Sequence, residues 1–276
     1  MSVHTAHSTQ FDNPLSAVRA RLTAATVYGL ARWTPYVESE IRGLRQVVTP
    51  GSVCVDVGAA AGLYTMALSR LCGRTGRVHS VEPLPFANFQ LARLLSAWQA
   101  HNVRRHVVAL GALPGQDLMH VPLGRYGLVT GRSFLDGSAA GPDPNVEFAN
   151  QISVAVTVDT LDGLCSREGI DRLEFVKIDV EGAELQVLEG GKEVIGALRP
   201  TMLIEIEARH TARYQRTPED VTTWMLDRGY TMHAWRRSWQ PARSIEAGTR
   251  NYLFQPSGRG RGASEKRPGR EATVPA

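Results

Sequence analysis

The sequence predicts an α/β fold in which a mostly parallel sheet carries helices on both faces. Short apolar runs alternate with amphipathic stretches over residues 53–98, and this βαβα order is typical of a parallel sheet with helical crossovers. Two glycines follow the first apolar run directly, where such sheets bind nucleotides. The chain has 276 residues, of which 43% are hydrophobic, so it can form one large domain with a substantial core.

Residues 1–48 are expected to form a helical extension ahead of that domain. Apolar side chains recur there at helical spacing in two groups, Leu15, Val18 and Leu22, and then Val37, Ile41, Leu44 and Val48. The pattern is interrupted at residues 33–35 and ends at Pro50-Gly51, a dipeptide that breaks helices. We therefore expect two helices, then a main domain over residues 49–256, and a disordered basic tail over residues 257–276.

The main domain is expected to alternate strands and helices along its length. Apolar runs predict strands at residues 53–57, 77–81, 152–158, 173–178, 202–206, 230–235 and 251–254. Amphipathic spacing predicts helices at residues 62–71, 85–98, 161–167, from 183 onward, and 217–228. Residues 111–150 are rich in Gly, Pro and Asp, which predicts a hairpin-containing insertion or a flexible loop that covers a substrate.

Charge and cysteine content narrow the classes of partner. Five basic and two acidic residues in 257–276 account for most of the formal charge of +4, so the body of the chain is near neutral. This distribution argues against a nucleic-acid partner. No apolar run is long enough for a membrane span, and three scattered cysteines suit a reducing compartment, so we expect a cytoplasmic protein. Oligomeric state stays open, with a homodimer through the N-terminal helices as one option.

The glycine-rich turn predicts a nucleotide site. Gly58 would allow a tight turn after the first strand, and Gly62 would let the next helix start close to it. Glu82 ends the second strand 26 residues after Asp56, near the offset of roughly 20 at which an acid binds ribose hydroxyls. The alternative for Glu82 is a solvated acid that caps the following helix.

The same turn indicates which nucleotide binds. A dinucleotide fingerprint has a glycine where the backbone meets a pyrophosphate, and here Ala59 and Ala60 follow Gly58 instead. S-adenosyl-L-methionine has no phosphate, and its ammonium group would favour an acid such as Asp56 nearby, directly or through water. We therefore expect this cofactor, with Ala59, Tyr64 and Pro83 completing the contacts.

A second acidic cluster follows a later strand. Lys177 and Asp179 lie two residues apart on one side of the strand predicted at 173–178, and Glu181 and Gly182 follow in the turn. Charges at the end of an otherwise buried strand are costly unless they are paired or used. The strand tip is therefore a candidate site.

The sequence resembles the FkbM-type methyltransferases over roughly residues 51–207. The segments that carry the resemblance are VCVDVGAAAG from Val53, SVEP from Ser80, VTVDTLDGL from Val156, FVKIDVEGAELQVLEGG from Phe175 and LIEIE from Leu203. The resemblance implies a seven-stranded class I methyltransferase fold of Rossmann-like type and O-methylation, commonly of sugars or polyketide-type natural products.

The resemblance also implies roles for individual residues. Asp56, Gly58 and Gly62 match the first cofactor motif, and Glu82 matches the acid that binds ribose. Ala109 and Leu110 match the segment beside the adenine, and Asp179 matches an acid near the methionine and the acceptor. Two departures from the family are expected: Ala60 stands where an asparagine is usual, and no asparagine is assigned to the helix after Glu82.

A small-molecule hydroxyl acceptor needs a base, because a hydroxyl is a poor nucleophile until its proton is leaving. Candidate catalytic residues at or just beyond the strand ends are Asp179, Glu181, Glu205 and His210, with Lys177 as either a catalytic residue or a partner of the acids. No metal ligand is assigned, since no ligand spacing is evident, although carboxylates could hold a divalent cation. We expect Tyr126, Arg132, Phe134 and residues 235–237 to line the acceptor pocket.

Two other functions remain open from the sequence alone. A nicotinamide-dependent oxidoreductase is disfavoured by the absent middle glycine. A catalytically inactive methyltransferase-like fold that serves as a binding module has no distinguishing mark in the sequence.

Overall fold

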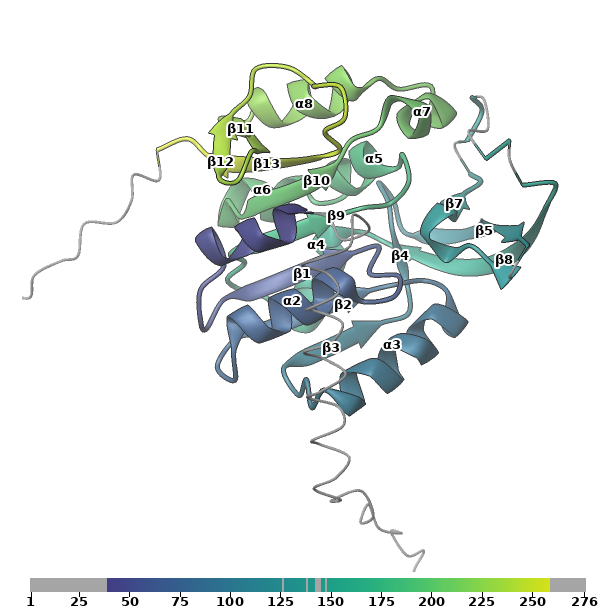
Figure 1. Cartoon of the computed structure of the whole chain (residues 1–276), viewed down its shortest axis with the longest axis horizontal. Coiled ribbons are helices and arrows are strands. Elements are labelled where there is room, and N and C mark those ends of the chain that lie inside the picture. Colours follow the sequence, from purple (N-terminus) through teal and green to yellow (C-terminus); the bar gives the residue numbers. More distant parts are fainter. Residues whose placement is uncertain (1–38, 126, 138, 142–144, 147, 259–276) are drawn as a thin grey trace, which may run out of the picture.

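The computed structural model describes residues 39–258 apart from 126, 138, 142–144 and 147. An eight-stranded sheet of strand order β12-β11-β13-β10-β9-β1-β2-β3 forms its centre (Figure 1). Its strands are β1 (Val53–Val57), β2 (Arg77–Val81), β3 (Val103–His106), β9 (Phe175–Ile178), β10 (Thr201–Glu205), β11 (Tyr230–Trp235), β12 (Trp239–Pro241) and β13 (Asn251–Pro256). The predicted α/β class and all seven predicted strands are present.

Strands β3, β2, β1, β9 and β10 run parallel, and β13 pairs antiparallel with both β10 and β11. The expected count of seven strands in one sheet is wrong. The predicted strand at 152–158 lies in a second sheet, and two strands of the main sheet, β3 and β12, were not predicted. The short strand β12 pairs with β11 through the register Trp235↔Trp239 and forms the edge of the sheet.

Helices cover both faces of the main sheet, as predicted. One face carries the 3-10 helix η1 (Ser39–Gln46) and α2 (Leu63–Cys72), with α3 (Pro85–Ala97) packed beside α2. The other carries α4 (Leu161–Glu168), α5 (Glu184–Glu189), α6 (Lys192–Leu198) and α8 (Pro218–Leu226). Because β1 is central, its side chains alternate between these layers, with Val55 facing α4 and Cys54 facing α2.

Much of the predicted helical extension lies outside the described residues, which begin at Ser39, and so does most of the basic tail. The described part of the second predicted helix is η1, whose Leu44 is fully buried against α2. Of the helices among the described residues, none combines the length and apolar character needed to cross a membrane. Cys54, Cys72 and Cys165 are buried free thiols, which agrees with their expected place in the core.

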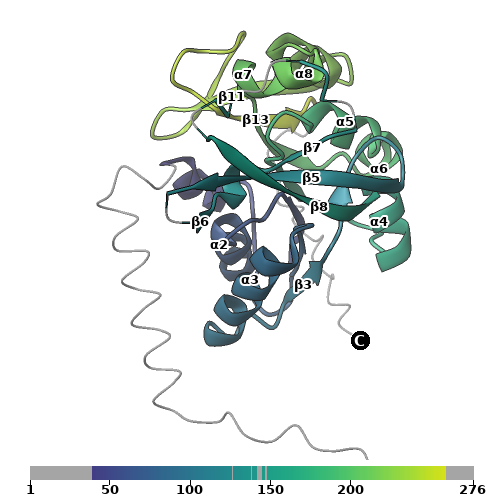
Figure 2. The ribbon, with the colours of Figure 1, turned by 90° about the vertical axis from the view of Figure 1, so that its right-hand side faces the viewer.

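The insertion predicted at 111–150 contains the expected hairpin and contributes to a second sheet of order β4-β8-β5-β6. Its strands are β4 (Ala109–Leu110), β5 (Gly115–Gly124), β6 (Gly127–Leu128), β7 (Phe134–Leu135) and β8 (Asn150–Asp159), with the 3-10 helix η2 (Thr130–Arg132) before β7. Figures 1 and 2 show β5 and β8 as long strands outside the main sheet.

The second sheet is attached to the segment after β10. This segment forms α7 (Ala208–Thr211) and the 3-10 helix η3 (Ala212–Tyr214). The hydroxyl of Tyr214 donates to the carbonyl of Leu135 at 3.0 Å, and the N–H of Gly141 donates to the carbonyl of Arg213 at 2.7 Å. The insertion is therefore held over the carboxyl ends of β9 and β10.

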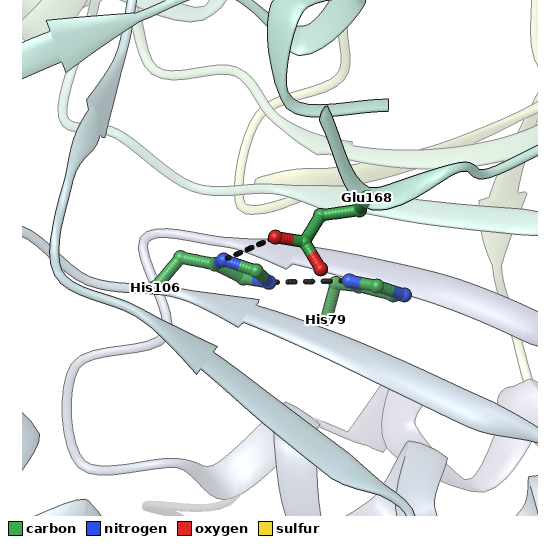
Figure 3. Close-up of side chains that lie close together, drawn as sticks. All are labelled: His79, His106 and Glu168. Atoms are coloured by element: carbon green, nitrogen blue, oxygen red, sulfur yellow. Dashed lines mark hydrogen bonds and ion pairs between the residues drawn. The ribbon is translucent and has the colours of Figure 1, made fainter. Parts of the chain in front are cut away.

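A buried polar cluster joins β2, β3 and α4 near the edge of the main sheet (Figure 3). His79 Nδ1 and His106 Nε2 lie 3.1 Å apart in a hydrogen bond, and Glu168 approaches His106 Nδ1 at 3.9 Å. Glu168 is also paired with Arg104 at 2.8 Å. Burial, followed by repulsion from His106, lowers the pKa of His79 to about 4, so both imidazoles are neutral near pH 7.

Candidate active site

A cavity of about 240 Å³ lies at the carboxyl ends of β1, β2, β9 and β10. Its floor is formed by the residues that end these strands, and its roof by residues of η2 and the strands of the insertion. The lining residues are Val57, Gly58, Ala60, Val81, Glu82, Pro83, Val108, Ala109, Leu110, Met119, Thr130, Gly131, Arg132, Ser133, Leu135, Asp179, Val180, Glu181, Glu205, Glu207, Arg209, His210 and Arg250. Parallel sheets bind their ligands at this end.

The tips of β1 and β9 touch in the floor of this cavity. Gly58 has φ +80°, a conformation that favours glycine, and a Cβ atom there would lie 1.8 Å from the carbonyl oxygen of Asp179. The N–H of Asp179 donates to the carbonyl of Val57 at 3.0 Å. The predicted requirement for glycine at 58 therefore has a second cause, the approach of the neighbouring strand tip.

Glu82 lines the cavity at the end of β2, where the sequence predicts a ribose-binding acid. It is 5% exposed, and its two carboxylate oxygens accept the N–H groups of Ala60 and Leu84, each at 2.9 Å. Burial raises the pKa of Glu82 to about 6 despite these hydrogen bonds. Each oxygen keeps a second lone pair, so the carboxylate can still accept two hydroxyl groups from a ligand.

Asn88 supports Glu82, and the expectation that the helix after Glu82 has no such asparagine is wrong. Its side-chain amide, on α3, donates to the backbone carbonyl of Glu82. The position of Asn88 on the helix predicted after Glu82 is the signal in the sequence that could have identified it.

The predicted adenine-side residues form an apolar wall next to Glu82. Pro83, Ala109 and Leu110 all line the cavity, together with Val108 and Met119. Ala109 and Leu110 are 4% and 2% exposed, and they belong to β4, which joins the second sheet by pairing with β8. A flat apolar wall beside a ribose-binding acid is the environment that an adenine ring requires.

Asp56, which was expected to act on the cofactor directly or through water, does not line the cavity formed by the described residues. It pairs in register with Ser80 of β2, and its carboxylate accepts the hydroxyl of Thr65 on α2 at 2.5 Å. Side chains alternate along a strand, so Asp56 is directed toward the α2 layer, as Cys54 is. Burial raises its pKa to about 6.

Three other predicted cofactor residues also lie behind the turn. Ala59 is buried in the cluster between α2 and α3, and Gly62 starts α2 with φ +85° against Leu91. Tyr64 packs in the core of the α2 layer beneath Lys177, whose ammonium lies 4.9 Å from the centre of its ring. These residues shape the turn and the helix start, and their expected direct contacts are not supported.

Lys177 lies beneath the cavity floor, in the α2 layer. It is fully buried, its Nζ donates to the side-chain oxygen of Asn251 at 2.8 Å, and it pairs with Asp179 Oδ2 at 3.4 Å. Burial alone would raise the pKa of Asp179, but Lys177 and a hydrogen bond with Glu205 hold it below its ordinary value. The sequence left two roles open for Lys177, as a catalytic residue or as a partner of the acids, and the structure favours the second.

The remaining predicted catalytic residues meet in the cavity. Glu181 has φ +56° in the turn after β9, Glu205 ends β10, and His210 lies on α7. His210 Nε2 is 3.1 Å from Glu181 Oε2, and Glu205 shares a hydrogen bond with Asp179. Burial and the charge of Asp179 raise the pKa of Glu181 to about 9 and hold that of Glu205 well above its usual range, whereas burial lowers the pKa of His210 to about 4.

The roof contains only part of the expected acceptor pocket among the described residues. Arg132 lines the cavity, but Phe134 packs against Arg213, whose guanidinium carbon lies 3.6 Å from the ring centre. Trp235 ends β11 and packs edge-on against Trp239, with ring centres 5.1 Å apart. Residues 235–237 do not line this cavity, contrary to the prediction, and Tyr126 lies outside the described residues.

The cavity residues fit S-adenosylmethionine. Glu82 offers buried acceptor oxygens for a ribose, the wall at 108–110 is apolar, and the turn at Gly58 holds the backbone close to β9. Carboxylates at the tips of β9 and β10 suit a ligand whose sulfur is cationic, and they would repel a pyrophosphate. The residues that line the cavity thus match S-adenosylmethionine better than a dinucleotide.

The fold and the cavity define a class I methyltransferase that uses S-adenosylmethionine as its cofactor. Residues 56–232 match the family model described as the methyltransferase FkbM domain, and this match spans more than half of the chain. The chain therefore belongs to the FkbM methyltransferase domain family. No curated protein matches it.

Solved structures resemble the chain at low sequence identity. Methyltransferase FkbM from Methylobacillus flagellatus KT is 17% identical with a TM-score of 0.49, and the match covers 87% of this chain and 52% of that one. An rRNA methylase from Streptococcus thermophilus is 14% identical, with a TM-score of 0.43 and coverage of 80% and 95%. Aeropyrum pernix fibrillarin with bound S-adenosyl-L-methionine is 14% identical, with a TM-score of 0.42 and coverage of 87% and 76%. The chain thus spans about half the length of the first of these.

Proposed function

We propose that this methyltransferase transfers the methyl group to a hydroxyl of a small molecule. The observation that carries the proposal is the buried set of titratable side chains, Glu181, Glu205 and His210, on the cavity wall beside the tip of β9. Glu82 marks the ribose end of the same cavity. An acceptor held between them would have its hydroxyl against groups that can take its proton.

When bound, S-adenosylmethionine supplies a methyl group on a cationic sulfur; the new C–O bond forms as the C–S bond breaks, and the electron pair of that bond stays on sulfur. The hydroxyl proton leaves to a facing side chain. His210 is the candidate, because burial lowers its pKa to about 4 and its imidazole is neutral near pH 7, whereas the raised pKa values of Glu181 and Glu205 keep those acids protonated. Most of the rate enhancement in such a displacement comes from holding the two reacting atoms in line. The chain contributes to this by the contact between Gly58 and Asp179.

The surroundings of the cavity support a small acceptor. The roof at residues 130–133 covers the acidic wall, which leaves a cavity of about 240 Å³. The cations Arg209 and Arg250, which line the cavity, are both paired with Glu207, at 2.6 and 3.0 Å. A cavity lined by several carboxylates repels the phosphates of a nucleic acid. These features favour a neutral hydroxylated acceptor, such as a sugar or a polyketide.

Calorimetric titration with S-adenosylhomocysteine tests the cofactor half of the proposal. We expect Glu82→Ala to weaken binding by more than tenfold, because a hydrogen-bonded carboxylate is lost, a change of about 1.4 kcal/mol or more. Asp56→Asn, which keeps the hydrogen bond to Thr65, should change the affinity by less than about threefold, since Asp56 lies behind the turn. Glu189→Ala, at an exposed position on α5, is the control. Wild-type affinity in Glu82→Ala would refute the assignment, and tighter binding of NAD would favour the oxidoreductase alternative.

Transfer of a labelled methyl group tests the acceptor half. The protein is offered a panel of hydroxylated glycosides and polyketides, and in parallel ribosomal RNA. Label in an alkali-stable ether of a small molecule is the expected result. Label in the RNA, or binding of the cofactor product without turnover on any acceptor, would contradict it, and the second outcome would favour a binding module.

A further inference from the structure

We infer that Glu181, Glu205 and His210 form a binding site for one divalent metal cation in the acceptor half of the cavity. The inference rests on the proposed function, since the cation would contact the acceptor hydroxyl. It assigns to three cavity residues a role beyond proton transfer.

The three side chains come from separate elements and converge on one point. Glu181 lies in the turn after β9, Glu205 at the end of β10 and His210 on α7. One ligand atom from each lies within 4.8 Å of the other two, and all three residues line the cavity. Two carboxylates and an imidazole on one side of a cavity leave the opposite side open to solvent or an acceptor, as catalytic metal sites require.

His210 and Glu181 approach without forming a hydrogen bond. His210 is 3% exposed, and its Nε2 lies 3.1 Å from Glu181 Oε2, yet neither atom has a hydrogen-bond partner among the residues that the structure describes. Buried polar atoms without partners are costly, on the order of 1–3 kcal/mol each. A separation of 3.1 Å is close to that expected for two adjacent ligands at roughly 2.1 Å from a shared cation. A cation would therefore satisfy both atoms.

The local charges leave room for a cation. Asp179, Glu181 and Glu205 place three carboxyl groups together, and Glu207 lines the same cavity. The cations that face them are Lys177 from beneath, Arg132 from the roof and Arg209 on α7. A dication bound by Glu181 and Glu205 would keep both carboxyl groups ionised and would favour an acceptor oxygen that has lost its proton.

The chemistry of the ligands indicates the class of metal. Carboxylate oxygens with a single imidazole suit Mn²⁺ and related divalent ions, and Mg²⁺ more weakly. The other cluster of this kind among the described residues, His79, His106 and Glu168, lacks this geometry: its imidazole nitrogens point at each other in a hydrogen bond (Figure 3). In that cluster the two facing nitrogens already pair with each other, whereas His210 Nε2 and Glu181 Oε2 have no hydrogen-bond partner among the described residues.

Mn²⁺ binding to the full chain, treated first with a chelator, tests the site by electron paramagnetic resonance and calorimetry. We expect one Mn²⁺ per chain in the wild type. Glu181→Gln and His210→Gln should each raise the Kd by roughly 100-fold, at the upper end of the loss seen when a supporting group is removed. Glu189→Gln and His101→Gln, both at exposed positions, are the matched controls and should bind as the wild type does. Titration with S-adenosylhomocysteine in each variant shows that the cofactor site has folded.

The outcomes separate the cation from the proposed function. If the wild type binds no Mn²⁺, or binds it equally well in both ligand variants, the metal site is wrong. Methyl transfer to a hydroxyl that survives chelation would also overturn the metal site, while it would leave the proposed function standing. Mn²⁺ binding that is lost in the ligand variants, together with methyl transfer that is lost on chelation and restored by Mn²⁺, would support both.

Discussion

Replacing His79 should remove a component of the folding stability that depends on pH. In the folded chain, burial and the neighbouring His106 lower the pKa of His79 to about 4, against an ordinary value near 6.5. The unfolded chain therefore binds a proton on His79 as the pH falls through 6.5, whereas the folded chain does not until about 4. The contribution of His79 to the free energy of unfolding is therefore fully present above pH 6.5, and it is lost progressively as the pH falls to about 4.

The size of this loss follows from the two pKa values. At about 1.4 kcal/mol per pH unit, the interval corresponds to roughly 3 kcal/mol for His79 alone. Urea unfolding at a series of pH values between 7.5 and 4 measures it, with His79→Gln compared to the wild type. The difference in unfolding free energy between the two proteins should shift by about 3 kcal/mol across that range, in favour of the variant at low pH.

A comparison of variants removes the contribution of other groups. Asp56 and Glu82 also titrate in this range, but they do so in both proteins, so they cancel in the difference. His101→Gln, at an exposed position, should run parallel to the wild type. Parallel curves for His79→Gln would show that His79 is protonated equally in both states, and the reasoning from burial would fail.

Two further substitutions test how the strand tips are built. Gly58→Ala should lower the free energy of unfolding by more than about 3 kcal/mol and abolish cofactor binding, because a Cβ atom would lie 1.8 Å from the carbonyl of Asp179. The control is Gly169→Ala, where φ is +63° but the space is open, and it should cost only about 1 kcal/mol in the same unfolding measurement. Lys177→Met should cost about 3–5 kcal/mol in urea unfolding, since it leaves Asp179 buried without its partner, and a loss below 1 kcal/mol would contradict the pairing.

The fold could be predicted because its strands are short apolar runs with distinct boundaries. Strand β1 and strand β2 lie where the sequence predicted them, at Val53–Val57 and Arg77–Val81. Strand β12 was missed because Trp239–Pro241 has three residues, none fully buried, and contains a proline, so it lacks the signals of a strand. Strand β3 was missed for a similar reason, since two of its four residues are exposed arginines.

The site could be predicted only to the level of the elements. A strand end followed by an acid indicates a position at the rim of the sheet, and Glu82, Asp179, Glu181, Glu205 and His210 all line the cavity. The direction of a side chain just before a strand end depends on the register of the pleat and on the layer packed against it.

Asp56 and Lys177 illustrate this limit. They are partners in the register between β1 and β9, and both side chains are directed toward α2. No local pattern in the sequence shows that two acid-rich tips share one buried ammonium.

The turn after β9 connects this buried layer to the cavity. Lys177, which donates to Asn251, holds Asp179 from beneath, and the chain then passes through positive φ at Glu181, +56°, and Gly182, +111°. A Cβ atom at Gly182 would lie 2.2 Å from the carbonyl oxygen of His210, so the turn packs directly on α7. A positive φ at a residue other than glycine costs roughly 1–2 kcal/mol, and such strain persists where the surrounding structure imposes it. Here the buried ion pair on one side and α7 on the other impose it, and the result is that the carboxylate of Glu181 lies beside the imidazole of His210.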